Sequence, residues 1–260
     1  MIGLGMYSDS CRRSIKSGDH LLSLSDSELE KDLGIKNKLH RKKLRLALSL
    51  VNNDVDPLTR EAHQLDYLWV ARWLDDIGLP QYKENFINGR IDGAVLHRLT
   101  VQDLVHLNIN SKVHYCSLRR GIQLLRSTNF NTDTLKRRVP PSEIKSNDWK
   151  PEEIALWTSH RVMEWLRSIE LSEYTPNLRG SGIHGALIIY EPAFDCDLLA
   201  SLLSIPSSRT LLRRHIATHF NQLIGFDLVQ IKRDYRSKNP ILSPSSKISV
   251  SFFLLTHTSN

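Results

Sequence analysis

The stretch from Leu68 to Gly93 reads LWVARWLDDIGLPQYKENFINGRIDG, and its pattern recurs further along the chain. The stretch from His160 to Gly185 reads HRVMEWLRSIELSEYTPNLRGSGIHG, and a shift of 92 residues aligns the two without a gap. Each has apolar residues at i, i+3, i+4 and i+7: Val70, Trp73, Leu74 and Ile77 in the first, and Val162, Trp165, Leu166 and Ile169 in the second. This spacing predicts an α-helix with one apolar face.

A third copy lies upstream. Residues 2–7 (IGLGMY) match residues 77–82 (IGLPQY), and the same shift of 75 residues takes Gly18 to Gly93. Each copy ends in a longer helical stripe, and Ser25 with Glu28 forms the capping box of a short helix. Because no segment alternates convincingly with period two, we predict an all-α protein in which a unit of about 65–70 residues occurs three times.

These repeats predict the domain organisation. We expect a partial first repeat over residues 1–53, a second over 65–128 and a third over 154–225. Residues 129–153 contain the basic triplet Lys136, Arg137 and Arg138 and a Pro-Pro pair, which favours an irregular linker. Residues 226–260 match no repeat, and we expect this tail to be mostly disordered.

Composition narrows the function classes. The chain of 260 residues carries 35 Lys and Arg against 28 Asp and Glu, a formal net charge of +7. A basic balance favours nucleic acid, an anionic membrane surface or an acidic protein as partner. No apolar run reaches the roughly 18–20 residues that a membrane-spanning helix needs, so membrane insertion is not expected. Cys11, Cys116 and Cys196 are far apart, which favours reduced thiols in a cytosolic compartment.

The apolar pattern of the repeats resembles the sterile alpha motif (SAM) family. Three strings, WVARWLDDIGLPQYK, HRVMEWLRSIELSEYTPNLRGSGIHGALI and TLLRRHIATHFNQLIG, resemble the C-terminal part of the liprin-beta family, and the resemblance covers roughly residues 1–225. It implies three tandem five-helix bundles used for protein–protein association. It also implies a cytoplasmic protein recruited to the cell cortex, at adhesion or presynaptic sites.

The first repeat departs from this pattern. Its counterparts of Trp73 and Leu74 would lie before Met1, so the first bundle is predicted to lack helix 1. Leaving large apolar side chains uncovered costs about 1.5–3 kcal/mol each. We therefore expect this repeat to be loosened, to dock on its neighbour, or to belong to a longer chain.

The sequence contains no convincing catalytic or ligand site. Gly180, Gly182 and Gly185 spell G-x-G-x-x-G, but a dinucleotide site needs a preceding strand, whereas here a helix precedes it. His215 and His219 are one helical turn apart without the glutamate of a zinc-protease motif. No nucleophile lies in a known signature. We predict no catalytic, cofactor-binding or metal-binding residues and no enzymatic activity.

Charged residues supply the candidate partner-binding sites. SAM-like domains commonly associate through the start of the last helix of one domain and the middle region of another. The predicted basic residues at the starts of the last helices are Lys38, His40, Arg41, Lys42, Lys112, His114, Arg209, Arg213 and Arg214. The predicted acidic residues of the middle regions are Asp26, Glu28, Glu30, Asp32, Glu191, Asp195 and Asp197. Complementary charges of this kind set orientation and association rate.

Two functions fit these features. The first is a non-enzymatic scaffold whose SAM domains bind other SAM domains, by resemblance those of liprin-alpha, with self-association as a further option. The second is RNA binding through the basic run from Lys38 to Arg45. Aromatic residues lie in the predicted core and do not alternate with this run, which disfavours the stacking that single-stranded RNA needs. We therefore expect protein partners, and neither nucleic acid nor a small molecule.

Overall fold

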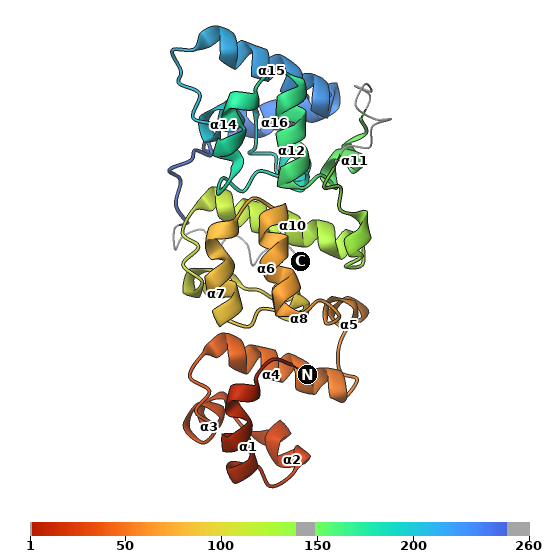
Figure 1. Cartoon of the computed structure of the whole chain (residues 1–260), viewed down its shortest axis with the longest axis vertical. Helices are drawn as coiled ribbons and strands as arrows, with labels where there is room; N and C mark the ends of the chain where they lie inside the picture. The colour runs from red at the N-terminus through yellow and green to blue at the C-terminus, as the bar shows by residue number, and fades with distance from the viewer. Residues whose placement is uncertain (1, 139–148, 249–260) are drawn as a thin grey trace. The chain divides into compact units, whose positions relative to one another are not determined.

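The computed structural model describes residues 2–138 and 149–248, and within them the chain is all-α (Figure 1). No β-strand forms there, and the extended pairing is limited to two isolated bridges, Ser111 with Lys247 and Lys136 with Trp157. The predicted fold class is confirmed. The chain divides into two compact units, Met1–Arg72 with Lys83–Leu107, and Trp73–Tyr82 with Asn108–Asn260. This division cuts the second repeat, so one part of it packs with the first repeat and another with the third.

The first unit holds the first repeat and the short helices of the second. Its elements are η1 (Gly5–Tyr7), α1 (Ser8–Ser14), α2 (Gly18–Ser23), α3 (Asp26–Lys31), α4 (Lys38–Val51), α5 (Pro57–Ala62), α7 (Lys83–Asn88), α8 (Gly93–His97) and α9 (Val101–His106). The helix α6 (Tyr67–Asp76) begins in this unit and ends in the other.

The second unit holds the last helix of the second repeat, the whole third repeat and the C-terminal helix. Its elements are η2 (Pro80–Tyr82), α10 (Lys112–Ser127), η3 (Thr132–Thr134), α11 (Pro151–Ala155), α12 (Ser159–Ser168), η4 (Ser172–Leu178), α13 (Gly185–Tyr190), α14 (Cys196–Leu202), α15 (Thr210–Ile224) and α16 (Phe226–Lys238). The order of elements therefore repeats as the sequence pattern does.

Local sequence signals set the helix starts. Ser25 and Glu28 form the predicted capping box of α3, and Thr100 and Asp103 form that of α9. The long helices α4 and α10 begin after Asn37 and Ser111, whose side chains accept hydrogen bonds from backbone N–H groups of the first turn. The cap positions thus place α4 and α10 in the same register within their repeats.

The first repeat has its own small core. Its buried residues are Leu4, Leu24, Leu29, Leu33, Ile35 and Leu44, with Ile2, Tyr7, Cys11, Ile15, Leu21 and Leu48 packed around them. Among the described residues, no helix of the first repeat corresponds to α6 of the second. The start of α4 packs against second-repeat residues of the same unit, and α4 contacts α8 (Figure 1). The first repeat therefore docks on its neighbour.

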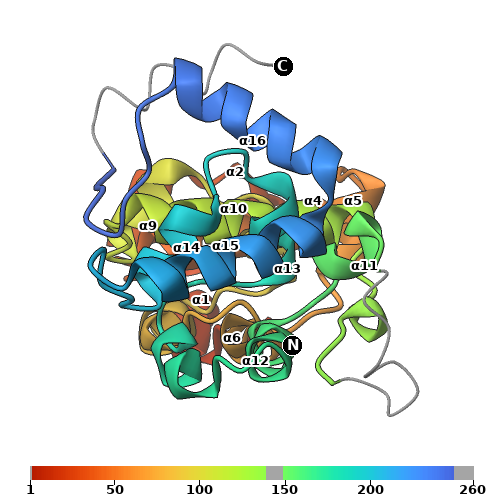
Figure 2. The same ribbon diagram turned by 90° about the horizontal axis from the view of Figure 1, so that it is seen from above.

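The expectation of a disordered tail is wrong for residues 226–238, which form α16. This helix packs on α15 of the third repeat (Figure 2). Beyond it, Leu242 is buried, Ser246 O accepts from Lys112 N, and Ile248 N donates to Asn110 O. The linker is also more ordered than expected, since Lys136 pairs with the third repeat through Leu156 O. Residues 139–148 and 249–260 lie outside the described residues.

Candidate docking surfaces on the repeats

The start of α4 contacts the short helices of the second repeat through buried ion pairs. Lys43 is only 3% exposed, and its Nζ lies 2.9 Å from Asp92 Oδ2 and 2.8 Å from Arg90 O. Lys42 Nζ lies 2.5 Å from Asp103 Oδ2. Burial acts to raise the pKa of the Asp103 carboxyl, but the hydrogen bonds from Lys42 and Thr100 and the charge of Lys42 outweigh it and lower that pKa. A basic end of one repeat therefore meets an acidic middle of the next.

A histidine and a tyrosine complete this contact. His40 Nε2 donates to Asn88 O at 2.7 Å, and the Tyr7 hydroxyl donates to His40 Nδ1 at 2.9 Å. Both ring nitrogens are satisfied by a neutral imidazole, and burial lowers the pKa of His40. The ring is thus fixed in one tautomer at neutral pH.

An apolar contact lies beside these polar groups. Leu39, the second residue of α4, is 1% exposed, and a Cβ placed on Gly89 would lie 3.0 Å from Leu39 Cδ1. The glycine of the second repeat therefore lets the leucine approach its backbone closely. We name the Tyr7 turn and the first two turns of α4 the end surface of the first repeat. The facing segment, Asn88–Asp103, is the middle surface of the second.

The contact between the second and third repeats uses the same positions. The Tyr82 hydroxyl lies 2.8 Å from His114 Nδ1, as Tyr7 does from His40. Burial lowers the pKa of His114, and a hydrogen bond to the backbone of Gly180 partly offsets it. Val113, which corresponds to Leu39, is 1% exposed. The end surface of the second repeat therefore meets a loop of the third.

That loop is the G-x-G-x-x-G segment. Gly180 N and Gly182 N both donate to Gly78 O at 3.1 Å, and Gln81 Nε2 donates to Gly180 O at 3.0 Å. Gly180 and Gly182 adopt positive φ angles. The glycines thus serve repeat-to-repeat packing, and this loop follows η4 instead of the strand that a dinucleotide site requires.

Two deeper contacts hold the third repeat to α10. His184 is fully buried, its Nε2 donates to Ser117 O at 3.1 Å, and burial lowers its pKa to about 4. Arg120 Nε lies 3.0 Å from Glu191 Oε2, and both side chains are largely buried. Glu191 O also accepts from Lys232 Nζ of α16 at 2.8 Å, and burial lowers the pKa of Lys232 to about 8.

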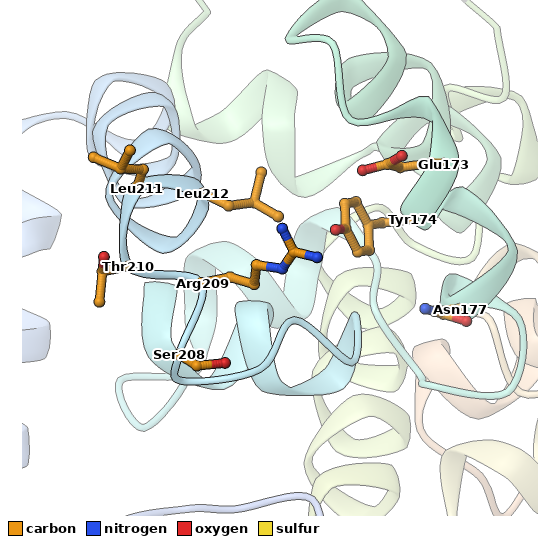
Figure 3. A pocket seen from close by; sticks show the side chains of 8 residues that line it. All are labelled: Glu173, Tyr174, Asn177, Ser208, Arg209, Thr210, Leu211 and Leu212. Atoms are coloured by element: carbon orange, nitrogen blue, oxygen red, sulfur yellow. The ribbon is translucent and has the colours of Figure 1, made fainter.

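The third repeat presents the same end surface without an occupant among the described residues. Its hollow of about 800 Å³ is lined by Glu173, Tyr174, Asn177, Ser208, Arg209, Thr210, Leu211 and Leu212 (Figure 3). Tyr174 stands where Tyr7 and Tyr82 stand in their repeats, and Arg209 extends toward its ring (Figure 3). Leu211 corresponds to Leu39 and Val113, yet it is 76% exposed. We name Glu173, Tyr174, Arg209, Leu211, Leu212 and Arg214 the third-repeat end surface.

The predicted basic residues differ in whether they lie in a contact between repeats, bind within their own repeat or face solvent. His40, Lys42 and His114 lie in the contacts between repeats described above. Lys112 is half-buried, with its N–H paired to Ser246 O. Lys38 is exposed at the first residue of α4.

The remaining basic residues bind within their own repeat or face solvent. Arg41 donates to Ile35 O at 2.7 Å and lies 3.1 Å from Glu30. Arg213 donates to Ile205 O at 2.8 Å. Arg209 and Arg214 lie on the third-repeat end surface, where Arg214 is exposed. The predicted role of all these residues in binding a partner stays a prediction.

The predicted acidic residues of the first repeat are exposed and mostly bind locally. Asp26 lies 3.4 Å from Arg45, and Glu30 pairs with Arg41. Glu28 accepts from Ser25 N at 2.7 Å as the capping-box residue. Asp32 is exposed at the end of α3.

In the third repeat, Arg236 of α16 forms ion pairs with two of the predicted acidic residues. Arg236 Nη1 lies 2.7 Å from Asp195 Oδ2 and 2.6 Å from Asp197 Oδ2, and it lowers the pKa of Asp197. Glu191 pairs with Arg120. The middle of the third repeat is therefore already engaged by its own chain, through α10 and α16.

Sequence reasoning missed several residues of these contacts, above all Lys43, Asp92 and Asp103. Asp92 and Asp103 could have been singled out from the sequence, because both cap short helices and Asp103 belongs to the weaker Thr100 capping box. The tyrosine–histidine pairs could also have been found, since Tyr7 with His40 and Tyr82 with His114 keep nearly the same separation in sequence. Burial of Lys43 could not be predicted, because nothing in the sequence distinguishes it from the other basic residues between Lys38 and Arg45.

Over residues 2–138 and 149–248, no group of His, Cys, Asp or Glu side chains could hold a metal ion. No helix in the described ranges is long and apolar enough to cross a membrane. The three cysteines are free, and burial raises the pKa of the Cys116 thiol to about 12, which makes it unreactive.

Comparison with known proteins agrees with the repeat pattern. The SAM (sterile alpha motif) domain family matches residues 1–51, 63–126 and 154–224. Human Liprin-beta-1 is 53% identical over 232 residues, which cover 89% of this chain and 22% of that protein. A Liprin-beta homolog of Caenorhabditis elegans is 38% identical over 251 residues, covering 96% of this chain and 25% of that protein. Human Liprin-alpha-1 is 36% identical over 227 residues, covering 84% and 18%. The chain spans about a quarter or less of the length of these curated relatives.

Proposed function

Because this chain belongs to the liprin-beta family of tandem SAM proteins, we propose that it is a scaffold whose third-repeat end surface binds a SAM repeat of the liprin-alpha type. The domain family and the relatives support the coarser function, a non-catalytic protein-interaction module. The choice of partner is our proposal.

The proposal rests on the exposure of one aliphatic side chain, the second residue of the last helix in each of the three repeats. Leu39, which approaches Gly89 of the second repeat, and Val113 are each 1% exposed, whereas Leu211 is 76% exposed. Exposing a leucine that could be buried forgoes about 1.5–3 kcal/mol of apolar transfer free energy. An exposed apolar group rimmed by polar and charged residues is the arrangement of a protein–protein interface with an apolar centre and a polar rim. A SAM middle surface is the partner that the two internal contacts show for such an end surface.

Calorimetric titration of this chain with the SAM repeats of a liprin-alpha protein tests the proposal. We expect saturable binding that Leu211→Glu weakens at least about tenfold, because a carboxylate would be buried against apolar groups. The matched control is Ile231→Glu on α16, which changes a leucine-sized side chain that is 54% exposed outside the end surface. Absence of binding by the unaltered chain, or equal binding by the Leu211→Glu variant, would contradict the proposal.

The RNA-binding alternative loses its motivation in the structure. The run from Lys38 to Arg45 does not present a basic patch, because Lys42 and Lys43 are paired with carboxylates of the second repeat. Arg41 and Arg45 donate to backbone carbonyls of their own repeat. Phosphate binding would require these cations to be exposed. We therefore propose protein partners alone.

The family resemblance extends the proposal to location. A scaffold of this kind would act in the cytoplasm at the cell cortex, at adhesion or presynaptic sites. Imaging of a fluorescently tagged chain beside markers of those sites tests this part of the proposal. Cortical enrichment that Leu211→Glu abolishes would support recruitment by a SAM partner, and a uniform distribution of the unaltered chain would oppose it.

A further inference from the structure

Residues 242–248, which follow α16, lie against the start of α10, and we name them the strap. Ser246 O accepts from Lys112 N at 2.8 Å, and Ile248 N donates to Asn110 O at 3.0 Å. These two hydrogen bonds form an isolated bridge that no strand continues within the described residues. A segment held by so few bonds opens at a much lower cost than the whole fold does.

A tight turn of serines forms the middle of the strap. Ser246 N donates to Ser243 O at 3.0 Å, which closes a β-turn with Pro244 at its second position. Ser243 N donates to Ser246 Oγ at 3.0 Å. The Ser243 hydroxyl lies 3.0 Å from Ser246 Oγ and 3.1 Å from Ser245 Oγ. The Ser243 hydroxyl is therefore the central side-chain group of this turn.

Ser243 with Pro244 is one of two places where the sequence has a serine or threonine directly before a proline. The other is Thr175 with Pro176. Thr175 is 7% exposed within η4, and its hydroxyl donates to Ser172 O at 2.8 Å. Ser243 is half-buried, and Pro244 beside it is exposed. The two dipeptides thus differ in how readily an enzyme could reach the hydroxyl, although their sequence motif is the same.

A serine before a proline is the substrate motif of proline-directed protein kinases. Proline has no N–H, so it suits a kinase pocket that offers no acceptor to the residue after the serine. It also favours an extended backbone at the residue before it, which is the form that a substrate takes in a kinase cleft. The turn of the strap must open for such binding, and the few bonds between the strap and α10 permit this.

We propose that Ser243 is a phosphorylation site for a proline-directed kinase, and that the phosphate keeps the strap off α10. In the transfer, the γ-phosphoryl group of ATP bonds to Ser243 Oγ and its bond to the β-phosphate oxygen breaks. ADP leaves, and the hydroxyl proton passes to the catalytic aspartate of the kinase. This inference is independent of the proposed function.

The phosphate disfavours the closed strap for two physical reasons. Its three oxygens need room beside hydroxyls of Ser245 and Ser246 that already lie 3.1 and 3.0 Å from Ser243 Oγ. It also carries about two negative charges at neutral pH, and a charge is less well hydrated at a half-buried position than in an open segment. Lys112 N in the first turn of α10 then loses its acceptor, Ser246 O.

Incubation of the full chain with ATP and a mitogen-activated or a cyclin-dependent kinase, followed by mass spectrometry of its peptides, tests the site. We expect a phosphate at Ser243 and none at Thr175. Pro244→Ala keeps the serine hydroxyl and restores an N–H, and it should lower the initial rate at least about tenfold. The matched control is Pro240→Ala, which removes an exposed proline outside the motif and should leave the rate unchanged.

Hydrogen exchange of the phosphorylated chain tests the opening of the strap. The N–H of Lys112 should exchange at least about tenfold faster than in the unmodified chain, because it has lost its acceptor. Ser243→Ala, taken through the same kinase reaction, should keep the slow exchange.

Three results would overturn the inference: no phosphate at Ser243 with either kinase, a Pro244→Ala variant modified as fast as Pro240→Ala, or unchanged exchange at Lys112 after phosphorylation. Binding of liprin-alpha SAM repeats that stays sensitive to Leu211→Glu in any of these cases would leave the proposed function standing.

Discussion

Gly18, Gly93 and Gly185 occupy the same place in the three repeats, but their surroundings differ. A Cβ on Gly93 would lie 2.0 Å from Ala62 O, and one on Gly185 would lie 1.7 Å from Ile154 O. The N–H groups of these two glycines also donate to Leu65 O and Trp157 O, both at 2.8 Å. Gly18 has no atom within 4 Å of its Cβ position. The glycine is thus required where a segment preceding the bundle packs against it, and the described part of the first repeat has no such segment.

The last helices repeat this contrast. Leu125 of α10 is fully buried, whereas Val51, its counterpart in α4, is 81% exposed. In α10, Gly121 lies against Trp73 and Ile77, which come from α6 and the turn that follows it. Leu39, His40, Lys43 and Leu44 at the start of α4 are nevertheless buried where this helix docks on the second repeat. In the first repeat, the start of the last helix therefore keeps its contact with the neighbouring repeat, whereas the end of that helix lacks the contacts within the bundle that α10 makes.

The glycine contrast predicts the largest effect on stability. Gly93→Ala and Gly185→Ala should each lower the unfolding free energy by more than about 3 kcal/mol, because backbone would have to move away from the new methyl group. Gly18→Ala should be neutral or stabilising by up to about 1 kcal/mol, since it restricts the unfolded chain without a clash. Denaturant melts of the three variants measure this, and equal effects at all three positions would refute the contrast.

A truncation pair tests the last helices. Leu125→Ala should cost about 2–5 kcal/mol, because it leaves a cavity in a packed core. Val51→Ala should change stability by less than about 0.5 kcal/mol, since the valine is exposed. Urea melts report both values. A large loss from Val51→Ala would show that the end of α4 is covered in solution.

The contact between the second and third repeats should depend on pH through His184. Burial lowers the pKa of this histidine to about 4, from an ordinary value of 6.5. The unfolded chain therefore binds more protons than the folded chain between these values. The contribution to stability is complete above pH 6.5 and falls as the pH drops toward 4, by about 2 kcal/mol at pH 5. His184→Gln, which keeps a donor for Ser117 O, should flatten melting temperatures measured from pH 7 to pH 5, and an unchanged slope would exclude this origin.

Much of the fold could be predicted because it is determined by residues that are close together in the sequence. Helical apolar spacing, capping boxes and the recurrence of one pattern predicted the all-α class and the three repeats. The helix α16 could not be predicted in this way, because its apolar residues Phe226 and Ile231 face solvent. Val229 is its buried apolar residue, and its polar contacts are made by Lys232 and Arg236 with groups about forty residues earlier in the chain.

The predicted role of the charged residues in binding a partner stays a prediction, and the contacts within the chain follow the same charge pattern through partly different residues. The principle that basic helix starts face acidic middle regions holds between the first two repeats, but through Asp92 and Asp103 and not through the more acidic run of α3. Which carboxylate meets which cation depends on the approach of segments distant in sequence. Exposure of Leu211, on which the proposed function rests, is likewise a property of the assembled repeats, since Leu39 has the same residue type and is buried.

Hydrogen exchange of this chain, alone and with liprin-alpha SAM repeats, tests the central claim most directly. The first amides of α15 have no intrahelical acceptor and are free to exchange in an open end surface. We predict that the partner slows exchange over residues 209–214 and around Tyr174, and leaves the exposed face of α16 unchanged. Binding that protects other segments and leaves residues 209–214 exchanging as before would contradict the claim.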